Sequence, residues 1–96
     1  MFVRTITVII PTGREDEMYA FWEWASTFVR RQPGYIRGQL WRDAADPQQF
    51  TELHVWQRAE DSTIYRTTEQ FRIVIERLAA LSEMPPRAAG YYVERE

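Results

Sequence analysis

Residues 50–57 read FTELHVWQ and alternate two kinds of side chain. Successive side chains of a β-strand point to opposite faces, so the stretch predicts a strand with two unlike faces. One face is small and aliphatic and comprises Thr51, Leu53 and Val55. The other is aromatic and titratable and comprises Phe50, Glu52, His54 and Trp56. We expect the second face to look into a hollow beneath covering helices.

Two further strands precede this one and are predicted by residues that favour β-structure. The first covers Phe2 to Ile10, a run rich in Val, Ile and Thr that ends at Pro11-Thr12-Gly13. The second covers Tyr35 to Arg42, where Gly38 marks a bulge or the close approach of another group. A polar turn over Asp43–Gln49 joins it to residues 50–57.

Helices are predicted where apolar side chains recur at helical spacing. The first begins near Thr12, which matches a capping box with Glu15, and it carries Trp22 in its apolar stripe. Beyond residue 57, a short helix runs from Ala59 to about Arg66. A longer helix then begins after Thr67 or Thr68 and stops at Pro85-Pro86.

A short final strand over Tyr91–Val93 completes the element order βαββαβ. This order predicts an α+β, ferredoxin-like fold with a four-stranded antiparallel sheet and the helices on one face. At 96 residues the chain has room for one domain, residues 1–96. The helices leave the other face of the sheet uncovered, and a second copy of the chain is the simplest cover. We therefore expect a symmetric homodimer.

The composition excludes several kinds of site. Cys, Lys and Asn are absent, which removes disulfides, thiolate metal sites, lysine Schiff bases and asparagine amides. One His cannot build the usual zinc site. The formal net charge of -2 argues against nucleic acid or an anionic membrane as a partner. No apolar run approaches the roughly 18 residues of a membrane span, so we expect a cytoplasmic protein.

Several short motifs follow one another in a specific order. They are Pro33-Gly34-Tyr35-Ile36, Asp46-Pro47 ahead of a strand that ends in Trp56, Ala59-Glu60, and Thr68 ahead of Phe71. In this order and spacing they resemble the antibiotic biosynthesis monooxygenase family of dimeric α/β barrels. The resemblance runs from about Phe28 to Tyr92. Because that barrel carries oxygenases, haem-degrading enzymes and isomerases, it is more specific for the fold than for the activity.

The resemblance assigns positions residue by residue. Trp56 stands at the family's tryptophan at the end of the third strand, which in relatives lines a cleft between sheet and helices. Nine residues on, where many relatives carry a histidine, this chain has Tyr65. Four residues before the tryptophan, where some quinone-forming relatives carry an asparagine, it has Glu52. Haem degradation is disfavoured because the haem-degrading members require an Asn that this chain lacks.

The candidate catalytic residues are Glu52, His54 and Tyr65. Alternate residues of a strand lie about 7 Å apart on one face, so Glu52 and His54 are neighbours. His54 is the predicted base and Glu52 its orienting carboxylate, since a carboxylate fixes the tautomer of an imidazole and raises its basicity. Tyr65 is predicted to donate a hydrogen bond to the substrate anion.

The predicted substrate-binding residues are of two kinds. Trp56 and Trp22 are aromatic and would wall the cleft, whereas Arg37 and Arg72 are cationic and would attract an anionic substrate. The resemblance then implies a cofactor-independent monooxygenase that takes molecular oxygen and a phenolic or similar electron-rich aromatic compound, with no bound cofactor or metal. Two alternatives stay open: a non-catalytic dimeric protein that binds a small aromatic ligand, and an isomerase or cyclase of the same barrel.

Overall fold

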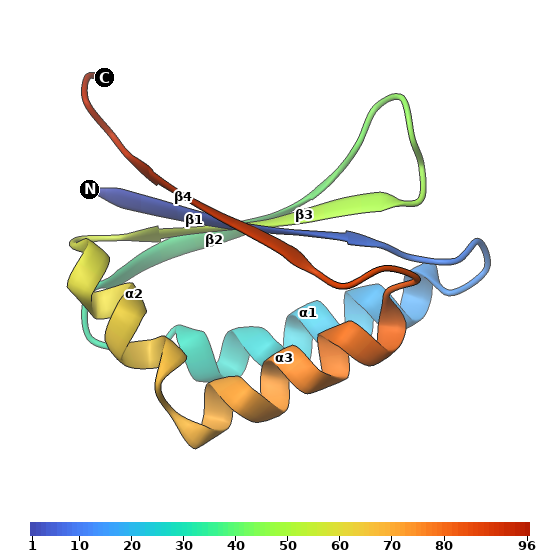
Figure 1. Cartoon of the computed structure of the whole chain (residues 1–96), viewed down its shortest axis with the longest axis horizontal. Helices are drawn as coiled ribbons and strands as arrows, with labels where there is room; N and C mark the ends of the chain where they lie inside the picture. Colours follow the sequence, from blue (N-terminus) through green and yellow to red (C-terminus); the bar gives the residue numbers. More distant parts are fainter.

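The computed structural model describes residues 1–96 and contains a four-stranded antiparallel sheet with three helices on one face (Figure 1). Its elements are β1 (Phe2–Ile9), α1 (Glu15–Val29), β2 (Tyr35–Arg42), β3 (Gln49–Trp56), α2 (Ala59–Arg66), α3 (Glu69–Leu81) and β4 (Arg87–Tyr92). The predicted α+β, ferredoxin-like βαββαβ arrangement is confirmed, with α2 as a short helix between β3 and α3. None of the helices is both long and apolar enough to cross a membrane.

The strand order is β2-β3-β1-β4, so β1 and β3 are the central strands. In their antiparallel register Arg4 lies opposite His54, and Ile6 lies opposite Glu52. On the other side of β1, Gly90 of β4 pairs with Arg4. The side chains that β1 and β3 turn toward the helices therefore form the sheet side of any site between the two layers.

The aromatic and titratable face of β3 points toward the helices, as the alternation of residues 50–57 predicts. Phe50 is 1% exposed, Trp56 2% and Glu52 4%. Trp56 packs with Tyr65 of α2, Phe2 of β1 and Val29 of α1 in a small cluster beside the main core. The apolar members of this face thus hold the layers together, while Glu52 is left as a buried carboxylate.

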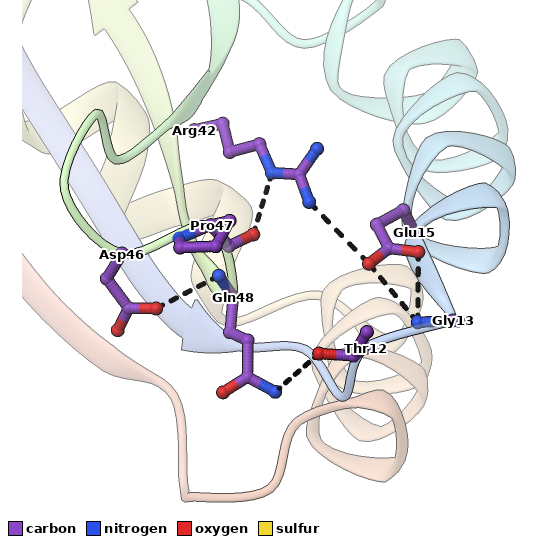
Figure 2. Close-up of polar contacts among 7 residues, drawn as sticks. All are labelled: Thr12, Gly13, Glu15, Arg42, Asp46, Pro47 and Gln48. Carbon is purple, nitrogen blue, oxygen red and sulfur yellow. Dashed lines mark hydrogen bonds and ion pairs between the residues drawn. The ribbon is translucent and has the colours of Figure 1, made fainter.

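The N-terminus of α1 differs from the prediction. The helix begins at Glu15 after Arg14, and no side chain caps it, so the expected capping box of Thr12 is wrong. Figure 2 shows the reason: Oγ1 of Thr12 accepts a hydrogen bond from Nε2 of Gln48 at 3.2 Å, while the Glu15 carboxylate accepts from the backbone N–H of Gly13. Thr12 instead ties the start of α1 to the loop between β2 and β3.

The same loop is held by Arg42 at the end of β2. Its Nε donates to the backbone oxygen of Pro47 at 2.7 Å, and its guanidinium lies 3.5 Å from the Glu15 carboxylate (Figure 2). Both partners are outside the sheet, so this contact fixes the hairpin end against α1 on the side away from Trp56.

The start of α3 and the start of β4 can also be compared with the predictions. Thr68 caps α3, because its Oγ1 accepts from the backbone N–H of Phe71 at 3.1 Å, which confirms one of the two predicted caps. The last strand starts at Arg87 rather than at the predicted Tyr91. Ala88, Ala89 and Gly90 have low intrinsic β-propensity, and pairing with β1 overrides it.

The sheet face that points away from the helices carries exposed aromatic side chains. Trp41 of β2 is 46% exposed and Tyr91 of β4 is 56% exposed. Between them Thr7 and Thr51 share a hydrogen bond of 3.0 Å across β1 and β3. No helix of the chain covers this face (Figure 1).

Candidate functional site

A cavity of about 30 Å³ lies between the sheet and the helices. The structure brings five of the seven predicted site residues to its lining: Trp22, Glu52, His54, Trp56 and Tyr65. They come from α1, β3 and α2. The volume holds water or dioxygen but not an aromatic ring, so a larger ligand enters only when lining side chains move.

The other two predicted residues lie elsewhere. Arg37 is exposed on β2 and pairs in register with Val55, which places it on the open face of the sheet. Arg72 is exposed on α3, where it pairs with Glu69 and, at 2.6 Å, with Glu76. Neither lines the cavity, so their placement does not support the substrate-binding role predicted for them.

Both ring nitrogens of His54 are occupied. Nε2 lies 3.1 Å from Oε1 of Glu52, and Nδ1 lies 2.9 Å from the hydroxyl oxygen of Tyr35. An ionised carboxylate only accepts hydrogen bonds, so we assign the proton to Nε2 and let Nδ1 accept from the Tyr35 hydroxyl. With this assignment His54 has no free lone pair for a proton from a bound molecule.

Glu52 has the free acceptor instead. While Oε1 accepts from His54, Oε2 is buried and has no hydrogen-bond partner. A buried carboxylate oxygen without a partner is unusual in a folded protein. The geometry therefore leaves Glu52, and not His54, with a free hydrogen-bond acceptor among the residues that line the cavity.

Tyr35 is a site residue that the sequence analysis missed. A Cβ atom at Gly38 would lie 2.2 Å from the Tyr35 hydroxyl and 3.1 Å from Nδ1 of His54, so only glycine leaves room for this hydrogen bond. The predicted close approach at Gly38 is confirmed. A register shift between Tyr35 and Arg37 interrupts the alternation of side chains along β2. The inward position of Tyr35 therefore cannot be predicted from a simple alternating pattern.

Aromatic rings surround the His54–Glu52 pair. Trp22 of α1 stacks on the His54 ring, with 5.6 Å between ring centroids and 23° between planes. Trp56 contacts Tyr35 edge-on at 5.1 Å and lies tilted against Tyr65 at 5.9 Å. The polar pair thus sits in a low-dielectric surrounding, where its electrostatic interactions are strengthened.

Both tyrosines of this group are poor acids. Burial raises the pKa of Tyr35 to about 12, and the charge of Glu52 adds to the shift although Arg30 opposes it. Burial, with a smaller effect from Glu52, also raises the pKa of Tyr65 to about 12. Near neutral pH both phenols therefore keep their protons, and that of Tyr35 is available for its hydrogen bond to His54.

Two arginines that the sequence analysis did not single out also line the cavity. Arg4 comes from β1 and Arg66 from the end of α2, and the Nε atom of each is buried without a hydrogen-bond partner. Burial, and secondarily the charge of Arg66, lowers the pKa of Arg4. The alternation Phe2, Arg4, Ile6 puts Arg4 on the inward face of β1, and this pattern could have identified Arg4 from the sequence.

No group of three or more His, Asp or Glu side chains comes together to hold a metal ion. The site contains one carboxylate, one imidazole, two phenols and two guanidinium groups in an aromatic setting.

Comparison with solved structures places the fold among known ones. The chain is similar to SnoaB, a cofactor-independent oxygenase from Streptomyces nogalater, with a TM-score of 0.82, 19% identity, and coverage of 99% of this chain and 95% of that chain. A conserved protein from Methanosarcina mazei Go1 has a TM-score of 0.85 at 12% identity and covers 98% of this chain and 94% of that one. At these identities the likeness concerns the fold alone.

A third solved structure, described as an antibiotic biosynthesis monooxygenase, has a TM-score of 0.81 at 17% identity, over 99% of this chain and 100% of that chain. Among curated proteins, no sequence matches the chain. The sequence model of the antibiotic biosynthesis monooxygenase family matches residues 1–77, which include both central strands and α2. The chain therefore belongs to the antibiotic biosynthesis monooxygenase family.

Proposed function

We propose that this protein is a cofactor-independent monooxygenase for a small, electron-rich aromatic compound with an acidic hydroxyl group. One observation carries the proposal: an unpartnered, buried carboxylate oxygen of Glu52 in a cavity walled by Trp22 and Trp56. Family membership and the similarity to the fold of SnoaB, itself a cofactor-independent oxygenase, support the reaction class.

The reaction needs no external reductant. A phenol with an unsubstituted ring carbon and one O₂ give a quinone and one water, so the substrate supplies all four electrons that O₂ takes up. Triplet oxygen reacts slowly with a neutral phenol, but the phenolate transfers one electron readily. The resulting radical and superoxide combine to a peroxide at the ring carbon. Loss of the ring proton with cleavage of the O–O bond then forms the new carbonyl.

Each residue has a role in this sequence. Glu52 takes the phenol proton at Oε2 and returns it to the peroxide; when the O–O bond of the hydroperoxide breaks, the departing hydroxide and the ring proton together form the water. His54, held by Tyr35, keeps the carboxylate oriented through its hydrogen bond to Oε1. Tyr65 remains protonated near neutral pH and donates to the oxyanion, while the indoles exclude water from the radical pair.

A homodimer is part of the proposal. The face of the sheet that the helices leave open exposes Trp41 and Tyr91, and a second copy of the chain covers both by the same surface on each subunit. A domain of 96 residues buries a modest share of its surface alone, so this cover adds stability. Because the second subunit supports the sheet, the helices are the layer that moves when the cavity widens for substrate.

Oxygen uptake by the purified protein tests the activity. In the presence of a metal chelator, a panel of monohydroxy and dihydroxy naphthalenes and anthracenes is expected to include a compound that raises oxygen uptake above the uncatalysed rate. Mass spectrometry of its product should show the quinone. Absence of uptake across the panel, with fluorescence showing that the compounds bind, would contradict the proposal.

A second candidate is a protein that binds an aromatic ligand without reacting it. The observation in its favour is that Tyr65 and Glu52 stand where, by the resemblance, many relatives carry His and some quinone-forming relatives carry Asn. Such a protein would quench the fluorescence of Trp22 and Trp56 on binding and leave oxygen untouched. An isomerase or cyclase would convert its substrate with no oxygen uptake and no oxygen atom added to the product.

A further inference from the structure

Three buried side-chain polar atoms in the chain lack a hydrogen-bond partner: Nε of Arg4, Oε2 of Glu52 and Nε of Arg66. All three residues line the same cavity. Buried polar groups are nearly always paired, because an unpaired one has lost its hydrogen bonds to water without a replacement. Their concentration in one cavity indicates that these groups are arranged for a ligand rather than for the fold.

Among the arginines, Arg4 and Arg66 are the two whose Nε is buried without a hydrogen-bond partner. Arg14, Arg42, Arg58 and Arg72 each form an ion pair with a Glu or Asp. Arg4 and Arg66 form none, and the only protein hydrogen bond of the Arg66 guanidinium is a donation to Thr63 at 3.2 Å. Two half-buried cations in one low-dielectric space repel each other, and a bound anion relieves that repulsion.

The charges around the arginine pair, Arg4 and Arg66, are unbalanced. Glu52 is the only acidic residue that lines the cavity, and one of its oxygens is taken by His54. His54 lies opposite Arg4 in the β1–β3 register, and Tyr65 precedes Arg66 on α2. Two formal positive charges therefore face one negative charge, next to aromatic side chains.

We propose that the arginine pair is a carboxylate-binding subsite, so that the ligand of this cavity is an aromatic acid. A guanidinium presents parallel N–H donors that match the two oxygens of a carboxylate, which a phenolate with one oxygen cannot engage equally. The apolar body of the ligand lies against Trp22 and Trp56. The inference rests on the proposed function only in taking that ligand to be the substrate.

Calorimetric titration with benzoate and benzamide tests the subsite, because the two probes have nearly the same shape and differ in charge. The expected result is at least a tenfold tighter affinity for benzoate, with quenching of tryptophan fluorescence. Arg4→Gln and Arg66→Gln are each expected to remove most of this preference. Arg31→Gln is the matched control, since Arg31 is exposed and lines no cavity, and it should keep the preference.

Equal affinity of the unaltered protein for the two probes would overturn the inference without any variant having to fold. An equal loss in Arg31→Gln would overturn it too, because that result shows a general effect of net charge. The titration is run under nitrogen, so it is independent of turnover. If neutral phenols are oxidised but benzoate binds no more tightly than benzamide, the proposed oxygenase activity stands and only the carboxylate subsite is refuted.

Discussion

Nε2 of His54 lies 3.1 Å from Oε1 of Glu52, while the second oxygen of that carboxylate meets no polar atom of the protein. The imidazole therefore spends its N–H on Glu52, and the carboxylate is the group that can accept a further hydrogen bond. This arrangement is the reason why we propose Glu52 as the group that takes the proton and His54 as the residue that positions it.

Exchange of Glu52 for Gln tests that assignment. Glu52→Gln keeps the shape and can still accept from His54, but it cannot take up a proton. We expect kcat for oxygen uptake to fall by about 10²–10⁴, the usual size of a general-base contribution. His54→Gln should cost less, since the carboxylate remains. A larger loss in His54→Gln than in Glu52→Gln would return the role of base to the histidine.

The contact between Tyr35 and His54 depends on Gly38. In Gly38→Ala the added Cβ displaces the Tyr35 hydroxyl, which it would otherwise approach to 2.2 Å. We expect this variant and Tyr35→Phe to lower oxygen uptake to a similar extent, and the double variant to lose little more, because both remove one hydrogen bond. Nuclear magnetic resonance of the His54 ring reports the loss directly. Fully additive losses would show that the two residues act separately.

Stability at high pH follows from the two buried phenols. Tyr35 and Tyr65 ionise near pH 12 in the folded chain and near pH 10 when unfolded, so between these values the unfolded state binds fewer protons. The free energy of unfolding is fully maintained below pH 10 and falls toward pH 12, by at most about 2 kcal/mol for each tyrosine because both keep some solvent screening. Denaturant titrations at increasing pH measure this fall.

The matching control is Tyr35→Phe combined with Tyr65→Phe, in which the fall should be shallower. Ultraviolet difference absorbance of the unaltered protein should show that two of the five tyrosines titrate late. A single titration of all five near pH 10 would contradict the burial of these phenols.

The homodimer is tested on the open face of the sheet. Leu53 lies in β3 on that face, in register with Thr5 of β1. We expect light scattering to give twice the 11.5 kDa chain mass for the unaltered protein and one chain mass for Leu53→Arg. Ile64→Arg is the control, because Ile64 is 63% exposed on α2 and away from the sheet. A monomer in the unaltered protein, or dissociation in the control alone, would refute the proposed interface.

The sequence predicted the fold well because its signals are local. Alternation in residues 50–57 places Glu52 and His54 under the helices, and the helical stripes and Thr68 give the ends of α2 and α3 within a few residues. The errors occur where contacts between distant parts of the chain determine the structure. Thr12 hydrogen-bonds to Gln48, and β4 begins four residues earlier than predicted because β1 supplies its partner strand.

The candidate site was predicted in part for the same reason. Residue type and alternation identified Glu52, His54 and Trp56, but no pattern along the chain shows that Tyr35 meets His54 through the space above Gly38. Arg37 and Arg72 were chosen for their charge, whereas Arg4 and Arg66 are distinguished by a buried Nε without a hydrogen-bond partner. The burial and the hydrogen-bond partners of a single side-chain atom cannot be predicted from the sequence pattern.

The proposed reaction is tested by the fate of the two atoms of dioxygen. The metal-free protein is supplied with a phenol that it accepts and with isotopically labelled oxygen gas, and quinone and water are analysed by mass spectrometry. We expect one labelled atom in the quinone and one in water for each turnover, without any added reductant. A quinone whose new oxygen comes from the solvent, or no turnover until a metal or reductant is added, would contradict it.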